Sequence, residues 1–199
     1  QESLWGGLRR LRWEARALPR MEVENDVPGD YLPFRFLQFS EWGSWRDVTD
    51  WAHQLFTVQG DAQVGLRAAV AEIARLPSPD ARAAAALAWV QNEVRYVSLS
   101  LGEGSHRPAA PLETLQRRYG DCKDKSVLLV ELLRGVGIPA QPVLVSSRIL
   151  KRMDRLLPAP TLFDHVIVQA HVGGRTFFLG ATAIGQVGRL ESLGQVWEA

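Results

Sequence analysis

The sequence predicts an α+β domain in which helices come first and an antiparallel sheet follows. Apolar residues recur at helical spacing in three segments: 61–76, 81–94 and 123–136. Three later segments are predicted as strands: about 140–146, 164–172 and 175–181. Helices followed by a run of strands are typical of the α+β class, so we expect the helices to pack on an antiparallel sheet.

The composition is that of an ordinary globular protein. Of 199 residues, 46% are hydrophobic and 23% are charged, which is enough to bury a core and excludes a wholly disordered chain. The formal net charge of +1 gives no reason to expect a nucleic-acid partner. No segment reaches the roughly 18 apolar residues of a membrane span. The single cysteine, Cys122, excludes an internal disulfide and a thiolate metal site, and we expect no cofactor.

The first quarter of the chain is predicted to be extended and then helical. Residues 8–16 alternate in polarity, which predicts a strand, and residues 34–39 predict a second one. A helix is expected from about 45 to 57. Its tryptophans either pack on the core, which we favour, or stack on a ligand: Trp42, Trp45 and Trp51. The chain lacks an initiator Met and starts in strand-like sequence, so we expect a piece of a longer protein.

Prolines set the boundaries of the middle helices. Pro77 and Pro79 end the helix over 61–76, and Asp80 is a plausible N-cap for the next one. Pro111 is suited to the first turn of a short helix that reaches Arg118. An extended segment at 95–100 and two loops are predicted between these elements: 102–110 and 148–161.

Cys122 is predicted at the start of the helix over 123–136. Irregular residues precede it and a strongly apolar run follows. Unpaired N–H groups and the helix macrodipole favour an anion at this end, so a thiol there has a lowered pKa. Two neighbouring lysines add positive potential, which two aspartates largely offset. The alternative is a small buried hydrophobic residue, which most free cysteines are.

A nucleophilic cysteine needs a base, and His165 is the best-placed histidine. It lies at the start of the otherwise apolar strand 164–172, where a satisfied core histidine is the alternative. His171 shares its face but lies about 20 Å along the strand. His53 and His106 are predicted to be surface residues.

Two runs carry a resemblance to a known family. Gly120-Asp121-Cys122-Lys123-Asp124-Lys125 and Phe163-Asp164-His165-Val166-Ile167-Val168 resemble the cysteine and histidine motifs of the bacterial transglutaminase-like superfamily. The segments 95–99 and 102–108 resemble those that precede the cysteine in this family. The resemblance implies a papain-like fold with the nucleophile at the N-terminus of a central helix.

The resemblance also implies a domain organisation. Residues 51–187 would be the transglutaminase-like core, and residues 1–50 the C-terminal end of a preceding β-rich domain with its connecting segment. Residues 188–199 would be a tail that leads to a missing C-terminal region. Neighbouring domains of the same longer chain would then be partners, and an exported, periplasmic location is implied.

The chemistry implied by the resemblance is acyl transfer by a Cys–His–Asp triad. Cys122 would attack an amide of a peptide or protein substrate, and His165 would take and return the proton. Water as acceptor gives proteolysis or deamidation, and an amine gives a crosslink. The backbone N–H of Cys122 would form half of an oxyanion hole, with Gln91 or Tyr96 as the second donor.

The third member of the triad is missing from the sequence. The family has an aspartate in a motif that resembles aromatic-aromatic-Leu-Asp-x-Thr, and Gly180 stands at that place here. Thr182 is the nearest local substitute, while Asp164 is disfavoured because neighbouring residues on a strand point to opposite faces. Glu191 stays open. We expect a cysteine hydrolase or acyltransferase with an incomplete triad, or a weak or inactive module that binds a peptide or protein.

Overall fold

The computed structural model describes residues 2–20, 35–58, 64–98, 105–147 and 153–193. The chain divides into two compact units, residues 1–36 and 37–199. In the first unit, β1 (Glu2–Trp5) and β2 (Leu8–Leu11) form an antiparallel hairpin. Gly6 and Gly7 link them with positive φ angles of 56° and 79°, a conformation that glycine adopts without steric cost in a two-residue turn.

The strand predicted over 8–16 is correct only as far as Leu11. Residues 12–16 are exposed and in no strand, and Arg12 and Arg16 contact the carboxylate of Glu14 instead. The alternation of polar and apolar residues continues to residue 16. The pairing with β1 ends at Leu11, which lies opposite Glu2. The Gly-Gly turn was the sequence signal for this hairpin.

The second unit begins with an irregular segment and one amphipathic helix. The strand predicted over 34–39 is wrong for the described residues 35–39, which pair with no strand and expose apolar side chains. The helix expected at 45–57 is confirmed as α1 (Trp45–Phe56). Ser44 caps it by accepting a hydrogen bond of 3.2 Å from the N–H of Asp47.

The remaining helices agree with the predicted segments, apart from their ends. They are η1 (Val64–Leu66), α2 (Arg67–Ala74), α3 (Pro79–Glu93), α4 (Pro111–Arg117) and α5 (Cys122–Gly135). Short 3-10 helices follow later in the chain: η3 (Met153–Arg155), η4 (Pro160–Leu162) and η5 (Leu190–Ser192). The predicted residues 61–63 lie outside the described part of the chain. The N-cap of α3 is Ser78 and not Asp80, because the Ser78 hydroxyl accepts from the N–H of Ala81 at 3.1 Å. Pro79 then occupies the first helical position, where no N–H is needed.

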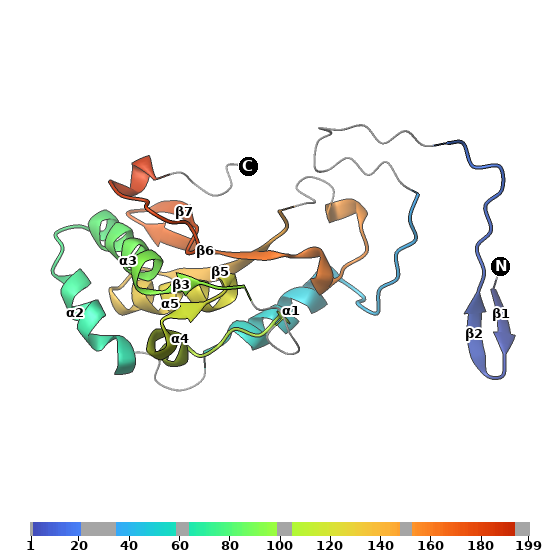
Figure 1. Cartoon of the computed structure of the whole chain (residues 1–199), viewed down its shortest axis with the longest axis horizontal. Coiled ribbons are helices and arrows are strands. Elements are labelled where there is room, and N and C mark those ends of the chain that lie inside the picture. Colours follow the sequence, from blue (N-terminus) through green and yellow to red (C-terminus); the bar gives the residue numbers. More distant parts are fainter. Residues whose placement is uncertain (1, 21–34, 59–63, 99–104, 148–152, 194–199) are drawn as a thin grey trace. The chain divides into compact units, whose positions relative to one another are not determined.

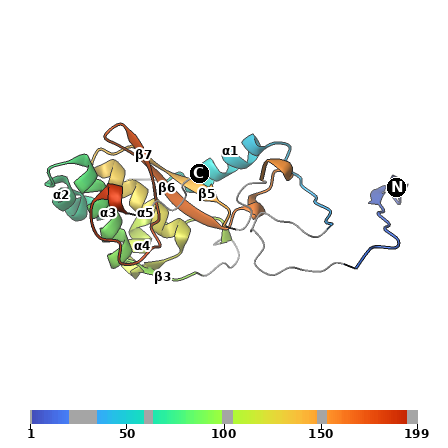
Figure 2. The ribbon, with the colours of Figure 1, turned by 90° about the horizontal axis from the view of Figure 1, so that it is seen from above.

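The predicted antiparallel sheet is confirmed. It consists of β5 (Ala140–Val145), β6 (His165–Val172) and β7 (Arg175–Leu179) in that order. Val145 lies opposite His165, and Val168 lies opposite Leu179. A separate parallel pair joins β3 (Arg95–Tyr96) to β4 (Tyr119–Gly120). Figure 1 and Figure 2 show β5, β6 and β7 side by side, with helices α3 and α5 against them.

Helix α5 is the central element of the core. Every residue from Cys122 to Leu133 is buried, and the helix contacts α3 and α4 as well as β5 and β6. Its leucines pack with apolar residues of α3 and the sheet: Leu87, Val90, Leu128, Leu129, Leu132, Leu133, Val168 and Leu179. Each such side chain contributes about 1.5–3 kcal/mol through burial, which fixes the position of the helix start. Within the described residues, no helix is long and apolar enough to cross a membrane.

Candidate active site

The first turn of α5 is closed by a reciprocal cap. The Asp121 carboxylate accepts from the N–H groups of Lys123 at 2.9 Å and Asp124 at 3.3 Å. The Asp124 carboxylate accepts from the N–H of Asp121 at 3.1 Å, which completes a capping box. Cys122 is therefore the first helical residue, as predicted.

Asp124 also ties the helix start to the preceding segments. Its carboxylate accepts from the N–H of Ala109 at 2.8 Å and contacts the Arg117 guanidinium at 2.5 Å. Gly120 packs closely on it, since a Cβ at Gly120 would lie 2.8 Å from the Cβ of Asp124 and 3.2 Å from Cγ2 of Thr114. The glycine before the cysteine is thus required by close packing.

The β3–β4 pair brings Tyr96 to the same place. Tyr96 lies opposite Gly120, and the N–H of Val97 donates to the Gly120 carbonyl at 3.0 Å. Beneath this pair, the ammonium group of the buried Lys125 donates to the carbonyl of Val94. Burial lowers the pKa of Lys125. Two short segments and a buried lysine therefore hold Tyr96 beside the turn that leads into Cys122.

One buried hydrogen bond joins α5 to the histidine strand. The hydroxyl of Ser126, one turn after Cys122, donates to the carbonyl of Val166 at 3.1 Å. Val166 directly follows His165 at the start of β6. This bond fixes the start of β6 against the first turns of α5.

A cavity of about 220 Å³ contains both predicted catalytic residues. Cys122 and His165 line it together with Tyr96. The rest of the lining is formed by Trp51, Phe56, Ser98, Ser105, His106, Asp121, Lys123, Leu144, Pro160, Phe163, Asp164 and Val166. The Trp51 ring meets the His106 ring edge to face at a centroid distance of 5.5 Å. The residues Cys122 and His165 thus line one small hollow with aromatic walls.

The other predicted site residues lie elsewhere. Gln91, Gly180 and Thr182 are not among the residues that line this cavity. The Gln91 amide donates to the Gly180 carbonyl at 3.0 Å and to Oε1 of Gln186 at 2.8 Å. Thr182 lies in the turn after β7, so strand alternation does not place it on the face of Gly180. Gln91 therefore holds the backbone at Gly180.

The thiol of Cys122 does not have the lowered pKa that its helix position predicted. Burial raises the pKa of Cys122 above its ordinary value, and the negative charge of Asp121 raises it further. The charge of Lys123 and hydrogen bonds from the backbone N–H groups of Val166 and Lys123 act in the opposite direction. Only 9% of the residue is exposed, so desolvation outweighs the helix terminus. The thiol is protonated at neutral pH.

His165 is shifted in the complementary direction. Burial lowers the pKa of His165, while the charge of Asp164 raises it by a smaller amount. The Asp164 carboxylate accepts from the N–H and the hydroxyl of Ser147 at 2.7 and 2.8 Å. Asp164 precedes the first residue of β6, so the alternation that argued against it does not apply, and it lines the cavity. The imidazole is neutral at neutral pH. Asp164, its neighbour in sequence, lines the same cavity.

Trp51, His106 and Asp164 line the cavity, although the sequence favoured another place for each of them. Trp51 was assigned to packing, His106 to the surface, and Asp164 was disfavoured. His106 is exposed as predicted, yet it borders the cavity. The family-like segment 102–108 was the available signal for it, and the tryptophan cluster was the signal for Trp51.

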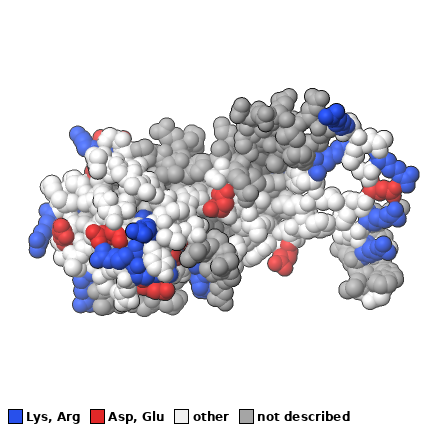
Figure 3. Space-filling view, viewed as in Figure 1, with Lys and Arg blue, Asp and Glu red and all other residues white. Residues whose placement is uncertain are grey.

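Among the described residues, no group of three His, Cys, Asp or Glu side chains could hold a metal ion. On the face drawn in Figure 3, basic and acidic side chains are intermingled over the unit that contains the helices. This face therefore carries charges of both signs.

Comparison with known proteins identifies relatives of this fold. The transglutaminase-like superfamily model matches residues 67–169, slightly more than half of the chain. This match includes both Cys122 and His165. Among curated proteins, no sequence matches the chain significantly.

Two solved structures are similar to the chain. A candidate protease from Parabacteroides distasonis superposes with a TM-score of 0.56 at 15% identity, over 69% of this chain and 26% of that one. A candidate cysteine protease from Cytophaga hutchinsonii has a TM-score of 0.42 and 21% identity, over 86% of this chain and 47% of that one. The chain therefore spans less than half the length of either protein. The first of these similarities supports the papain-like, transglutaminase-like fold.

Proposed function

The chain belongs to the transglutaminase-like superfamily, and we propose that it is a cysteine acyl-transfer enzyme that acts on a peptide or protein amide. The observation that carries the proposal is the shared cavity of Cys122 and His165. A thiol at a helix start and an imidazole on a facing strand are the two groups that covalent acyl transfer requires.

The resting charges favour activation of the thiol during the attack. Because the pKa of Cys122 is raised and that of His165 is lowered, both groups are neutral before substrate binds. His165 takes the thiol proton as sulfur bonds to the amide carbonyl carbon. The same proton then passes to the leaving amine as the C–N bond breaks, which leaves a thioester on Cys122. Water or a second amine attacks the thioester and regenerates the thiol.

The negative oxygen of the tetrahedral intermediate needs two donors. The N–H of Cys122 is at the first helical position, where no intrahelical acceptor exists. Tyr96 lines the same cavity and is the second donor that we favour. Gln91 is a weaker candidate, because its amide already donates to Gly180 and Gln186.

The experiment that tests the proposal measures the alkylation rate of Cys122 by iodoacetamide against pH. We expect His165→Ala to slow alkylation at pH 7 by about tenfold or more, since it removes the general base. Mass spectrometry after incubation with a mixed peptide library should then detect an acyl adduct on Cys122 of the parent. Equal rates in both proteins at every pH, with no adduct, would refute the enzyme.

One observation favours a second function. Gly180 cannot accept a hydrogen bond from an imidazole through its side chain, and it does not border the cavity. A weak or inactive module that binds a peptide in the Cys122 cavity is therefore the alternative. The alkylation rate of Cys122 in Gly180→Asp distinguishes the enzyme from the binding module, with Gly180→Asn as the control. An increase in alkylation rate with Asp alone supports an enzyme that lacks only an orienting acid.

A further inference from the structure

A second, larger hollow adjoins the cavity of Cys122. It has a volume of about 630 Å³ and lies between α1, β5 and the second half of α5. Its lining comprises Val48, Thr49, Ala52, His53, Phe56, Thr57, Val58, Glu131, Arg134, Gln141, Pro142, Leu144 and Phe163. Phe56, Leu144 and Phe163 also line the cavity of Cys122, so the two hollows meet at these three apolar side chains.

The residues that line the larger hollow differ between its two ends. The three shared side chains are apolar, and Pro142 and Ala52 add to this surface. Polar groups also line the hollow, from Thr49, His53, Thr57 and Gln141. Glu131 and Arg134 lie further along α5. At ~1.5 Å per residue, Glu131 lies about 13 Å beyond Cys122 along the helix axis. A substrate side chain that enters from the Cys122 cavity therefore contacts the shared apolar side chains first. The charged pair of Glu131 and Arg134 lies deeper along α5.

The charges of the hollow largely satisfy one another. The Arg134 guanidinium contacts the Glu131 carboxylate at 3.0 Å and donates from Nε to the Ala140 carbonyl at 3.1 Å. A charged side chain that entered would lose its hydration and would compete with an existing ion pair. A bulky apolar side chain has no charge to dehydrate and does not compete with the ion pair. Its transfer out of water stabilises the complex.

We propose that this hollow is a specificity pocket that takes a bulky apolar side chain, such as leucine or phenylalanine, beside the amide that Cys122 attacks. The assignment rests on the proposed function of the Cys122 site. It makes Phe56, Leu144 and Phe163 the shared wall between the reacting bond and the selected side chain.

The test uses two series of chloromethyl ketones, acetyl-X and acetyl-X-glycyl, in which X is Gly, Leu, Phe, Glu or Lys. We expect Leu and Phe to label Cys122 about tenfold or more faster than Gly, Glu and Lys in one series, because burial of such a side chain stabilises the complex by this order. Iodoacetamide, which has no side chain, measures the intrinsic reactivity of the thiol separately.

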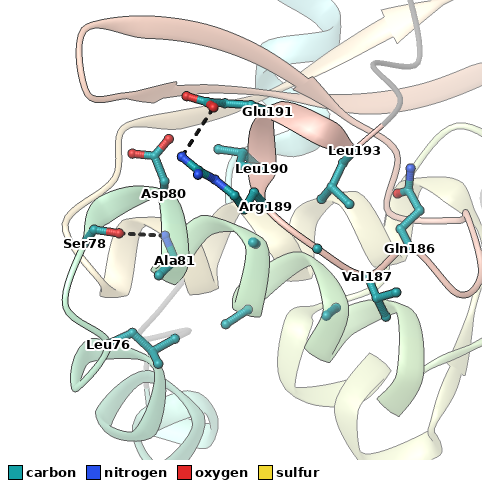
Figure 4. Close-up of a pocket in the computed structure, with 14 residues that line it drawn as sticks. Leu76, Ser78, Asp80, Ala81, Gln186, Val187, Arg189, Leu190, Glu191 and Leu193 are labelled. Atoms are coloured by element: carbon teal, nitrogen blue, oxygen red, sulfur yellow. Dashed lines mark hydrogen bonds and ion pairs between the residues drawn. The ribbon is translucent and has the colours of Figure 1, made fainter.

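A cavity-filling variant identifies the pocket. Ala52 lines the larger hollow and not the Cys122 cavity, so Ala52→Phe should reduce the preference for Leu and Phe to threefold or less. Each labelling rate is divided by the variant's own iodoacetamide rate, so that the preference does not depend on the reactivity of the thiol. Ala85→Phe is the matched control. Ala85 is also a half-buried helical alanine, and it lines a separate hollow between α3 and residues 186–193 that shares no residue with either cavity (Figure 4).

A measurement that needs no thiol chemistry completes the test. Peptides with one X among glycines are titrated into Cys122→Ser, and NMR shifts of the Ala52 and Leu144 backbone amides are followed. Leu and Phe peptides should shift both amides more strongly than Gly, Glu and Lys peptides do. Equal labelling and equal shifts for all X would overturn the pocket. If iodoacetamide then still distinguished the parent from His165→Ala, the proposed enzyme would stand.

Discussion

A thiol in the first turn of a helix experiences two opposing effects, and burial is the larger one at Cys122. A helix terminus stabilises an adjacent charge by roughly 0.3–1 kcal/mol. Complete burial shifts the pKa of an acidic group upward by up to about 3–5 pKa units. Since Cys122 is buried and Asp121 adds a negative charge, the upward shift prevails. The proposed reaction therefore requires a base, and His165 is the base that we propose.

The charge of Asp164 on His165 can be tested directly. Asp164 raises the pKa of His165 against the effect of burial. Asp164→Asn should therefore lower the pKa of His165 further, which NMR titration of the imidazole Cε1 proton would measure. Asp154→Asn removes an acid that does not line the cavity and should leave this pKa unchanged. An unchanged or higher pKa in Asp164→Asn would contradict the role of this charge.

At the scale of elements, the turn before α5 depends on a missing side chain. A Cβ at Gly120 would lie 2.8 Å from the Cβ of Asp124, an atom fixed to the helix backbone. Gly120→Ala should lower the free energy of unfolding by about 1–3 kcal/mol, because the first turn must shift. Urea denaturation would measure this.

Gly43→Ala is the control for Gly120→Ala. The added Cβ would meet only the terminal Oδ2 of Asp47, at 3.2 Å, and this atom can rotate away. A loss in the control as large as that in Gly120→Ala would show that close packing on Asp124 is not the cause.

The connection between α5 and β6 makes a second prediction at this scale. Ser126→Ala removes the buried bond to the Val166 carbonyl and should cost about 1–3 kcal/mol of stability. It should also slow iodoacetamide labelling of Cys122, because the start of β6 carries His165. Ser192→Ala removes an equivalent but exposed bond to the Arg189 carbonyl, at 2.8 Å, and should change neither quantity.

The helices and strands of the core could be predicted because local rules determine them. Prolines and apolar periodicity gave α3 and α5, and three strand-like runs after the helices gave an antiparallel sheet. The segments 12–16 and 35–39 were predicted as strands because alternation alone does not show whether a partner strand exists. The Ser78 cap was missed because both Ser78 and Asp80 are good N-caps, and Pro79 between them decides the outcome.

The candidate site could be predicted only in part for a different reason. Cys122 and His165 carry family-like motifs, whereas Trp51 and His106 come to the cavity from α1 and the loop before α4 through packing. The tryptophan cluster and the family-like segment 102–108 single out these residues, but no local pattern places their side chains together with Cys122. The direction of the Cys122 pKa also depends on burial by distant segments, which the sequence near the cysteine does not reveal.

At the scale of the whole molecule, the half-buried imidazole of His165 links stability to pH. The folded-state pKa of His165 is lowered, so the unfolded chain takes up a proton that the folded protein resists. This contribution to stability is present above about pH 6.5, the ordinary histidine pKa, and is lost as pH falls through the folded-state value. The fall in melting temperature between pH 7.5 and 5.5 should be smaller in His165→Gln than in the parent. An equal fall would disprove the link.

The protonated state of Cys122 has a consequence for the lifetime of the protein. Peroxides oxidise thiolates far faster than thiols, first to sulfenic acid and then to irreversible products. A buried, protonated Cys122 is therefore protected while the site is empty. As the only cysteine of the chain, it has no second thiol within the chain with which to form a rescuing disulfide. Burial thus slows the oxidation of the thiol on which the proposed function depends.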